Sequence, residues 1–570
     1  MVLVYKQLAK QMMQNKIFLF LLLVLTVLTS LSFYFVIFSI DGNIVMLNTL
    51  TTLTENQQLY KNALSANTSL AYTFFISTVG LTSFVVVMYF YRFYRANKKQ
   101  IGCIKSLGFK DRSLCACFVI FIALLSEVGA ILGLIAGYFL SDILIRANAN
   151  TYAVTGLVKN ISLSSLFVGL AVSTAVFCLV TFLCYFFVRG KEPAALIAGN
   201  ESHVRFSFSL RAANCISNMI PIKNKLTIRI ALRKPLSIFL IIAGVMSFSV
   251  CMILGRSLNI SSQKVFDSQT IGHNYEYDTR YSEYQTASIP ENVILYLDDT
   301  VQFSINGREI EQVVTGLYTL NNVYELQNLK GDVLPVPKAG TVYINPGLHQ
   351  TYGVNIGDRF VVDIAGVDLE VTVADIAANA KSVNIYVNAK ELSEVLSIPV
   401  GAYNGVLSRE KMNNGVAITK EQRIDTLNRE AVSSNISAVM NQSIGGLIGM
   451  ILIFLALYAS FGDNTRDMLI LHMMGYRTKY IRKMLIDVYM PIVWTAFFLT
   501  LAPSILLARS IQKSLSVSTN DYMPFGTNIL VIILVFAGLN LIYWSVQTLF
   551  GLGIKRIIIK EEISEFIYAE

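Results

Sequence analysis

Side chains that commonly catalyse reactions or bind metal ions are few and scattered in this sequence. The four histidines stand alone, without a second ligand at metal-binding spacing: His203, His273, His349 and His472. Cys115 and Cys117 form the closest cysteine pair, but they open an apolar segment and have no suitably spaced partner ligands. Asp298 and Asp299 are adjacent acids in what reads as a solvated turn. These residues predict neither a metal centre nor an acid–base active site.

Nucleotide chemistry is also not expected within the chain. The 570 residues contain no Gly-x-x-x-x-Gly-Lys-Ser/Thr phosphate loop, so ATP is not expected to bind in the P-loop manner. No other cofactor is indicated, and we expect a non-catalytic protein.

Glu127 is the candidate functional acid that remains. It lies in the middle of the apolar segment 116–138, and a carboxyl group inside a membrane is a candidate functional site by default. The alternative is a structural acid that is held protonated or bonded to a neighbouring hydroxyl. Asp487, near the end of another apolar segment, is expected to be solvated. Three glycines four residues apart share one helical face and predict close helix packing: Gly129, Gly133 and Gly137.

The composition indicates that long apolar segments, suited to crossing a membrane, position these residues. The chain is 54% hydrophobic and only 15% charged, whereas soluble proteins carry about 25% charged residues. The deficit falls in long apolar runs such as 17–40, which a soluble fold would not cover. The net charge of +9 comes from short loops flanking these runs, so it indicates membrane orientation rather than nucleic-acid binding.

Apolar windows predict eight transmembrane helices. They are expected near 17–40, 71–92, 114–141, 161–188, 236–256, 443–462, 485–507 and 528–550. Alternate loops are basic, with 27 Lys and Arg residues on one side of the membrane against five in the short loops on the other. The positive-inside rule therefore places both termini in the cytoplasm of a multi-pass cell-membrane protein.

The large segment 257–440 is expected outside the cell. It has 13 basic and 22 acidic residues, a net charge of −9, and it contains no cysteine. Alternating apolar residues predict a small α+β domain without disulfides. We expect strands near 293–297, 310–318, 341–344, 359–366, 368–376 and 383–388, a helix near 390–396, and a helical stalk over 426–442.

The order of elements repeats along the chain. Each half has a basic stretch, one span, an external excursion and three more spans. The loops after the second span of each half align without gaps, 97–113 over 464–484. Aligned pairs are Asn97 with Asn464, Lys99 with Arg466, Leu107 with Met474, Gly108 with Gly475, and Phe109 with Tyr476. Duplication explains equivalent placement better than the alternative, which is chance similarity between two basic loops.

These residues resemble the FtsX-like permease family. The paired loops end in Leu-Gly-Phe and Met-Gly-Tyr, and two further segments fit the family pattern, namely 191–199 (KEPAALIAG) and 224–235 (NKLTIRIALRKP). The external segments 341–379 and 384–408 are similar to the core domain of MacB-like permeases. The resemblance implies the permease subunit of a bacterial ABC transporter, with a separate ATPase, in two copies, docking under the membrane.

The resemblance also implies that the paired loops are coupling helices for the ATPase. The candidate residues are Lys99, Ile104, Leu107, Gly108 and Phe109 in the first loop, and Arg466, Leu471, Met474, Gly475 and Tyr476 in the second. The alternative is that both helices lie in the lipid interface and contact headgroups.

The expected architecture is therefore a polytopic α-helical membrane protein with two repeats of four spans, each arranged as one plus three. Its parts are a first repeat over 1–200 with a short external loop at 41–70, a cytoplasmic linker and entry helix over 201–235, a span over 236–256, the external domain over 257–440, spans over 441–550, and a cytoplasmic tail over 551–570.

The expected function is ATP-driven mechanotransmission to the external domain, for export, extraction or resistance involving a peptide, lipopeptide or lipid. One alternative is a regulator of a cell-wall hydrolase or sensor kinase that moves no cargo. An ion-coupled transporter is disfavoured because the spans show neither clustered charges nor broken helices. An enzyme is disfavoured because no nucleophile–base set can be assembled.

Overall fold

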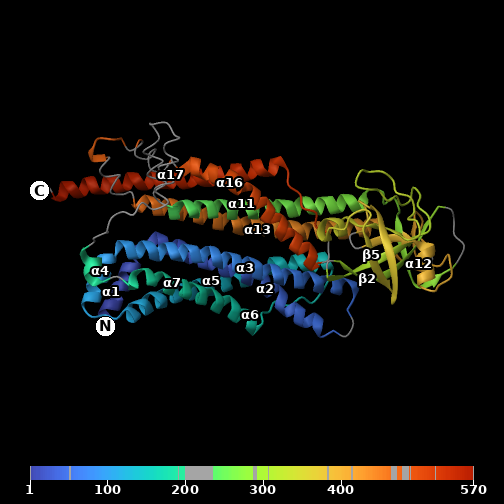
Figure 1. The fold of residues 1–570 in the computed structure, drawn as a ribbon, viewed down its shortest axis with the longest axis horizontal. Helices are drawn as coiled ribbons and strands as arrows, with labels where there is room; N and C mark the ends of the chain where they lie inside the picture. Colours follow the sequence, from blue (N-terminus) through green and yellow to red (C-terminus); the bar gives the residue numbers. More distant parts are fainter. Residues whose placement is uncertain are drawn as a thin grey trace.

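The protein is elongated, with two helical bundles side by side and a sheet domain at one end (Figure 1). The chain ends marked in Figure 1 lie at the opposite end of the molecule. A computed structural model describes residues 2–50, 53–190, 192–198, 235–286, 292–305, 307–381, 384–412, 415–463, 472–477, 480, 487, 489–519 and 522–568.

Eight helices in these described ranges are long and apolar enough to cross a membrane, which confirms the predicted number of spans. The candidate spans are Lys16–Asn48, Ala71–Ala96, Asp111–Tyr152, Leu163–Phe186, Ser237–Thr270, Ala438–Ala459, Tyr489–Val517 and Ile529–Leu549.

The first bundle holds four of these spans and three short helices. Its long elements are α2 (Lys16–Asn48), α3 (Glu55–Ala96), α5 (Asp111–Tyr152), and a last span made of α6 (Leu163–Phe167), the π-helix η1 (Val168–Val172) and α7 (Ser173–Arg189). Its short helices are α1 (Val2–Met12), α4 (Lys98–Ser106) and α8 (Pro193–Ala198).

The segment 41–70, expected to be a short external loop, is mostly helical. Helix α2 continues to Asn48, and α3 already begins at Glu55. Polar residues can extend a helix when they find partners, and the Asp41 carboxylate accepts hydrogen bonds from the Ser162 amide and hydroxyl at 2.9 and 2.7 Å. Thr54 then caps α3 in a reciprocal capping box.

The glycine face of α5 packs directly on α2. A Cβ atom added at Gly133 would lie 2.7 Å from the Ser30 Cβ and from the Val27 carbonyl oxygen, and Gly137 is equally close to Tyr34. Only a residue without a side chain permits this approach of two helices.

We expect Gly133→Ala to destabilise the protein by about 1–3 kcal/mol, because the added methyl group overpacks the α2–α5 contact. Gly80→Ala is the matched control: its Cβ would meet nothing within 4 Å, and alanine stabilises a helix by about 0.5–1 kcal/mol relative to glycine. Thermal unfolding of the purified chain in detergent would measure both. Equal shifts for the two variants would contradict the packing role.

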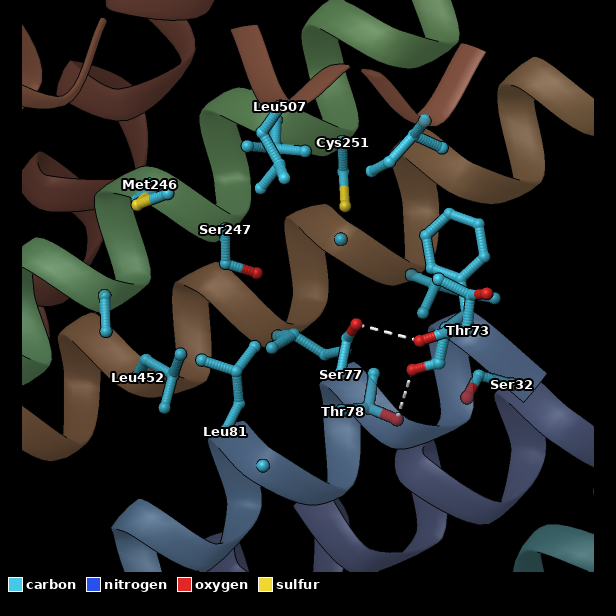
Figure 2. Close-up of a pocket in the computed structure, with 18 of the residues that line it drawn as sticks. Ser32, Thr73, Ser77, Thr78, Leu81, Met246, Ser247, Cys251, Leu452 and Leu507 are labelled. Atoms are coloured by element: carbon cyan, nitrogen blue, oxygen red, sulfur yellow. Dashed lines mark hydrogen bonds between the residues drawn. The ribbon is translucent and has the colours of Figure 1, made fainter. Parts of the chain in front are cut away.

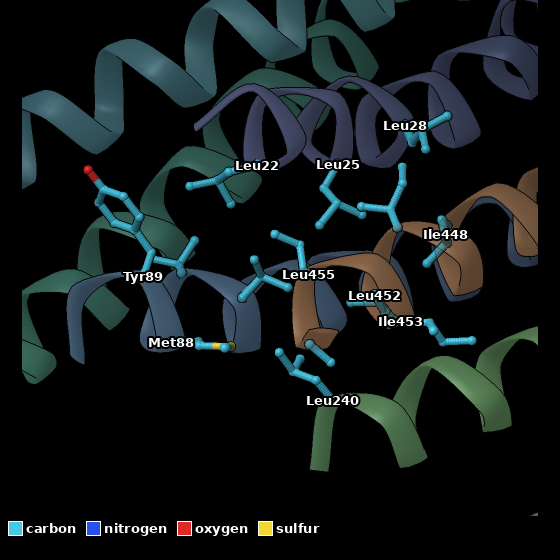
Figure 3. Packing of buried hydrophobic residues seen from close by; sticks show 14 of the residues in the cluster. Leu22, Leu25, Leu28, Met88, Tyr89, Leu240, Ile448, Leu452, Ile453 and Leu455 are labelled. Atoms are coloured by element: carbon cyan, nitrogen blue, oxygen red, sulfur yellow. The ribbon is translucent and has the colours of Figure 1, made fainter. Parts of the chain in front are cut away.

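The second bundle contains the other four spans. They are α11 (Pro235–Thr270), α13 (Lys420–Asp463), α16 (Tyr489–Thr519) and α17 (Ile529–Tyr568). The two bundles meet through leucine-rich faces, with Leu25 and Leu28 of α2 lying near Leu452 and Leu455 of α13 in one buried cluster (Figure 3).

The inserted domain between α11 and α13 is a single mixed sheet of nine strands. Its members are β1 (Tyr277–Gln285), β2 (Ile294–Ile305), β3 (Arg308–Leu317), β4 (Thr341–Ile344), β5 (Arg359–Ile364), β6 (Val367–Ile376), β7 (Asn384–Asn388), β8 (Tyr403–Ser408) and β9 (Val416–Thr419). The π-helical turn η2 (Leu348–Tyr352) follows β4, and helix α12 (Ala389–Val395) follows β7.

Six of the strands together form a closed sheet. The spatial order is β3-β7-β4-β6-β5-β2-β8-β1-β9, and the whole of β3 also pairs with residues 296–305 of β2. Strands β2 to β7 therefore form a closed ring, which leaves no open edge among them. The buried aliphatic side chains of these strands gather in one core, including Val301, Val314, Val342, Val373 and Ile385.

The remaining strands attach the ring to the membrane helices. Strand β1 follows α11, β9 leads into α13, and the two strands pair with Tyr277 opposite Thr419. The six predicted strands correspond to β2 through β7, whereas β1, β8 and β9 were not predicted. The unpredicted strands thus bring the upper ends of α11 and α13 together.

Candidate functional site

The end of the molecule opposite the sheet carries the first predicted coupling loop. Helix α4 packs on α8, because a Cβ at Gly102 would lie 2.9 Å from the Leu196 Cβ and 3.0 Å from the Ile197 Cγ1 atom. Ile101 is buried on the same side. This contact holds α4 flat against the bundle and turns its other face outward.

Lys105 ties α4 to two spans. Its Nζ atom lies 2.8 Å from the Asp111 carboxylate at the start of α5 and donates to the Arg189 carbonyl oxygen at the end of α7, 3.2 Å away. The Lys105 side chain is 7% exposed and the Asp111 side chain 34% exposed, so the ion pair is partly accessible to solvent. These contacts connect α4 to the adjoining ends of α5 and α7.

The predicted coupling residues lie on the outer part of this loop. Lys99 and Leu107 are exposed, Ile104 and Phe109 are half-buried, and Gly108 has φ +87°, a left-handed conformation that favours glycine. The Gly108 amide donates to the Lys105 carbonyl oxygen at 3.0 Å.

The second loop has the same turn. Gly475 has φ +83°, and its amide donates to the His472 carbonyl oxygen at 2.9 Å. Met474 and Tyr476 are exposed on either side of it. Arg466 and Leu471, the other predicted residues, lie outside the described residues.

Two long helices connect the membrane bundle to the sheet domain. At 1.5 Å per residue, the 36 residues of α11 and the 44 residues of α13 extend about 54 and 66 Å, well beyond a hydrocarbon core of about 30 Å. We call this helix pair the stalk. Along it, a Cβ at Gly445 would lie 2.0 Å from the Cys251 Cβ, and one at Gly449 would lie 2.8 Å from the Phe248 Cβ. Such close packing makes the pair one stiff element.

A buried amide joins the stalk to the sheet domain. The Asn379 side chain donates to the carbonyl oxygens of Ile271 and Glu325, at 2.9 and 2.7 Å, and accepts from the Gln327 amide. Beside it, burial lowers the pKa of His273 to about 3, so the ring is neutral near pH 7. Its Nε2 atom donates to the Asn379 carbonyl oxygen at 2.8 Å.

A buried ion pair lies deeper in the same junction. The Lys381 ammonium is 3.2 Å from the Asp278 carboxylate on β1, which also accepts a hydrogen bond from the Tyr296 hydroxyl on β2. Burial alone would raise the pKa of Asp278, but Lys381 and Tyr296 outweigh it and hold that pKa below its ordinary value. Asp298 is buried nearby and its pKa is raised by burial. This cluster fixes β1 against the ring.

A third contact joins the sheet domain to α16. The hydroxyls of Thr351, in η2, and Ser516, in α16, are both buried and lie 3.1 Å apart. Lower on α16, the Ser257 hydroxyl donates to the Gln512 side-chain oxygen at 2.7 Å, and both side chains are fully buried. The stalk and α16 therefore belong to one body with the sheet domain.

Glu127 lies half-buried on α5. Its neighbour Ser126 accepts a hydrogen bond from Thr174 at 3.0 Å, which connects the two helices. Glu127 is a single acid at this position, and its functional role stays a prediction.

A cavity lies between the two bundles (Figure 2). It measures about 560 Å³ and is walled by α2 and α3 on one side and by α11, α13 and α16 on the other. The sequence analysis missed this site. The only signal was a cluster of hydroxyls in one span, Thr73, Ser77 and Thr78, which gives no indication of what they face.

One family profile matches the chain in two places. The profile of the FtsX-like permease C-terminal region matches residues 72–193 and 443–557. Each match starts in the second span of a bundle and runs through one of the paired loops and the next two spans. A comparison with curated proteins found no match. The resemblance seen in the sequence is thus confirmed. It supports a permease-type role in an ABC transporter, in a family whose members are generally non-catalytic and typically partner an ABC ATPase.

Proposed function

We propose that this chain, which carries two FtsX-like permease regions, uses ATP hydrolysis by a separate ATPase to move its sheet domain. The observation that carries the proposal is the stiff stalk, which runs without interruption from the bundle to the paired strands β1 and β9. The coupling turns at Gly108 and Gly475 lie at the other end, so force applied there has a direct route to the sheet.

The two turns supply matching docking points. Each combines a glycine in a left-handed conformation with exposed apolar side chains, Leu107 in one loop and Met474 in the other. Two such turns in one chain accommodate two ATPase subunits, which fits a duplicated permease with spans arranged as one plus three in each half.

The orientation follows from the charge of the loops. The basic loops, both termini and the coupling turns face the cytoplasm, where an ATPase has access to ATP, and the acidic sheet domain is extracytoplasmic. The cargo is an amphiphile such as a peptide, lipopeptide or lipid. The apolar cavity between the bundles favours cargo handling over the alternative of a regulator that moves nothing.

Co-purification from native membranes tests this function. We expect mass spectrometry to find a P-loop ATPase with the wild-type chain, and the double variant Gly108→Glu with Gly475→Glu to lose most of it. Glutamate at these positions places a charge in the docking surface and strains the left-handed turn.

Gly156→Glu is the matched control. Gly156 has φ +78° and open space around it, as at the two coupling glycines, but it lies between α5 and α6. This variant should therefore keep the ATPase. Retention of the ATPase by the double variant would remove the docking assignment, and its absence from the wild-type preparation would remove the proposed function.

A further inference from the structure

We propose that the cavity between the bundles binds one acyl chain of a bilayer amphiphile. This inference rests on the proposed function only for the role of that chain, which would be the apolar part of the cargo. The binding itself is argued from the walls, the dimensions and the position of the cavity.

The cavity walls select an apolar occupant. None of the lining residues carries an ionisable acid, base or imidazole, and most are aliphatic or aromatic, with Phe84, Phe239 and Leu452 among them. Three of the hydroxyls that line it donate to carbonyl oxygens of their own helices: Ser32 to Thr29 at 2.8 Å, Ser77 to Thr73 at 2.8 Å, and Thr78 to Phe74 and Phe75 at 3.0 and 2.9 Å. Their protons are engaged, so they can only accept from a water molecule, which needs two to four polar partners, and an apolar occupant is favoured.

The cavity is also long enough for an extended chain. Its lining residues run from Phe239 to Cys251 on α11 and from Met440 to Leu452 on α13, about 18 Å along each helix. One leaflet of a bilayer has an acyl region of about 15 Å, half of the hydrocarbon core. A volume of 560 Å³ lies within the usual range of about 300–1,000 Å³ for small-molecule sites.

An aromatic pair lies at one end of the cavity lining. The rings of Phe84 on α3 and Phe239 on α11 stack with their centroids 4.3 Å apart and join the two bundles at that level. Because both bundles supply walls, the fit of an acyl chain depends on how the bundles are placed. Binding is thereby linked to the movement that the ATPase would drive.

Photolabelling of the full chain tests the inference. The protein would be placed in nanodiscs of phosphatidylethanolamine and phosphatidylglycerol, containing a phospholipid with a diazirine on its acyl chain. We expect adducts on the peptide that contains Met246, Ser247 and Cys251, which point into the cavity (Figure 2).

Two variants locate the label. Gly80 lines the cavity, and a Cβ there would meet nothing within 4 Å, so Gly80→Leu fills the space and should reduce these adducts about tenfold. Ile131→Phe adds bulk on the exposed face of α5 and should leave them unchanged. Equal cavity labelling in Gly80→Leu, or wild-type adducts confined to outward faces, would overturn the proposal.

A second measurement needs no variant. Cys251 lines the cavity and Cys103 is exposed on α4. A charged, water-soluble maleimide should modify Cys103 and spare Cys251, and equal rates would show a water-filled cavity and overturn the proposal. Neither measurement requires an ATPase, so loss of the acyl site and loss of the transporter function are distinguishable.

Discussion

Lys381→Met is expected to weaken the junction between the stalk and the sheet domain by about 3–5 kcal/mol. The substitution leaves the Asp278 carboxylate buried without its counter-charge, at the strand that follows α11. Burial alone would lower the pKa of Lys381, yet Asp278 raises it well above its ordinary value, so the ion pair is intact near neutral pH. Hydrogen exchange of the full chain in detergent would show the loss as faster exchange in β1, β2 and β8, while the membrane helices stay protected.

The double variant Lys381→Met with Asp278→Asn is the control for this effect. It removes both charges and leaves no uncompensated ion, so it should recover much of the lost protection. Lys420→Met, which breaks the exposed pair with Glu276, should change the opening free energy measured by hydrogen exchange by less than about 1 kcal/mol. If Lys381→Met behaved like Lys420→Met, the ion pair would not hold the junction together.

The sequence predicted those parts of the fold that depend on local patterns. Eight spans follow from long apolar runs, and strands β2 to β7 follow from alternation of apolar residues. Strand β1 was missed because its residues, YDTRYSEYQ, are mostly polar and largely half-buried or exposed, so no apolar alternation marks it. Strands β8 and β9 are short and are stabilised by pairing with β1, a contact that only the folded chain creates.

In the candidate site, too, features with a local sequence pattern were predicted and features made by tertiary packing were not. The paired turns were predicted from the aligned Leu-Gly-Phe and Met-Gly-Tyr segments, and Gly108 and Gly475 both have positive φ. Their role in coupling came from the family resemblance and stays a prediction. The Lys381–Asp278 pair joins residues 103 positions apart, and the cavity has walls from both halves of the chain. No spacing rule connects such residues, because tertiary packing alone brings them together.

The placement of contacts indicates which parts move. The stalk, α16 and the sheet domain are joined by buried polar contacts such as Ser257 with Gln512, and the first bundle is joined internally by the glycine face of α5. Between the bundles, apolar contacts and a cavity predominate among the described residues, and Thr151 donates a hydrogen bond across them to the Arg429 carbonyl oxygen at 3.3 Å. Apolar surfaces without directional bonds slide more readily than hydrogen-bonded ones, so relative movement of the bundles is the motion the structure favours.

A covalent link between the bundles should therefore stop ATP-driven movement. In the double variant Phe84→Cys with Phe239→Cys, a short thiol-cleavable cross-linker replaces the stacked rings that bridge α3 and α11. We expect ATP hydrolysis by the purified complex to fall to the basal rate of the ATPase, and to recover when the linker is reduced. A complex treated in the same way but with the native cysteines alone corrects for reaction elsewhere.

Asn259→Cys with Asn435→Cys provides the matched comparison. These two side chains are hydrogen-bonded between α11 and α13, so the same cross-linker joins two helices that already move together in the stalk. Hydrolysis should then stay at the level of the untreated complex. If linking the bundles left hydrolysis intact, or if linking the stalk helices stopped it equally, the moving boundary would not lie between the bundles. The moving boundary would then have to lie within the second bundle. There Gly445 of α13 packs against Cys251 of α11, and Gln512 of α16 is hydrogen-bonded to Ser257 of α11, so sliding would break buried contacts.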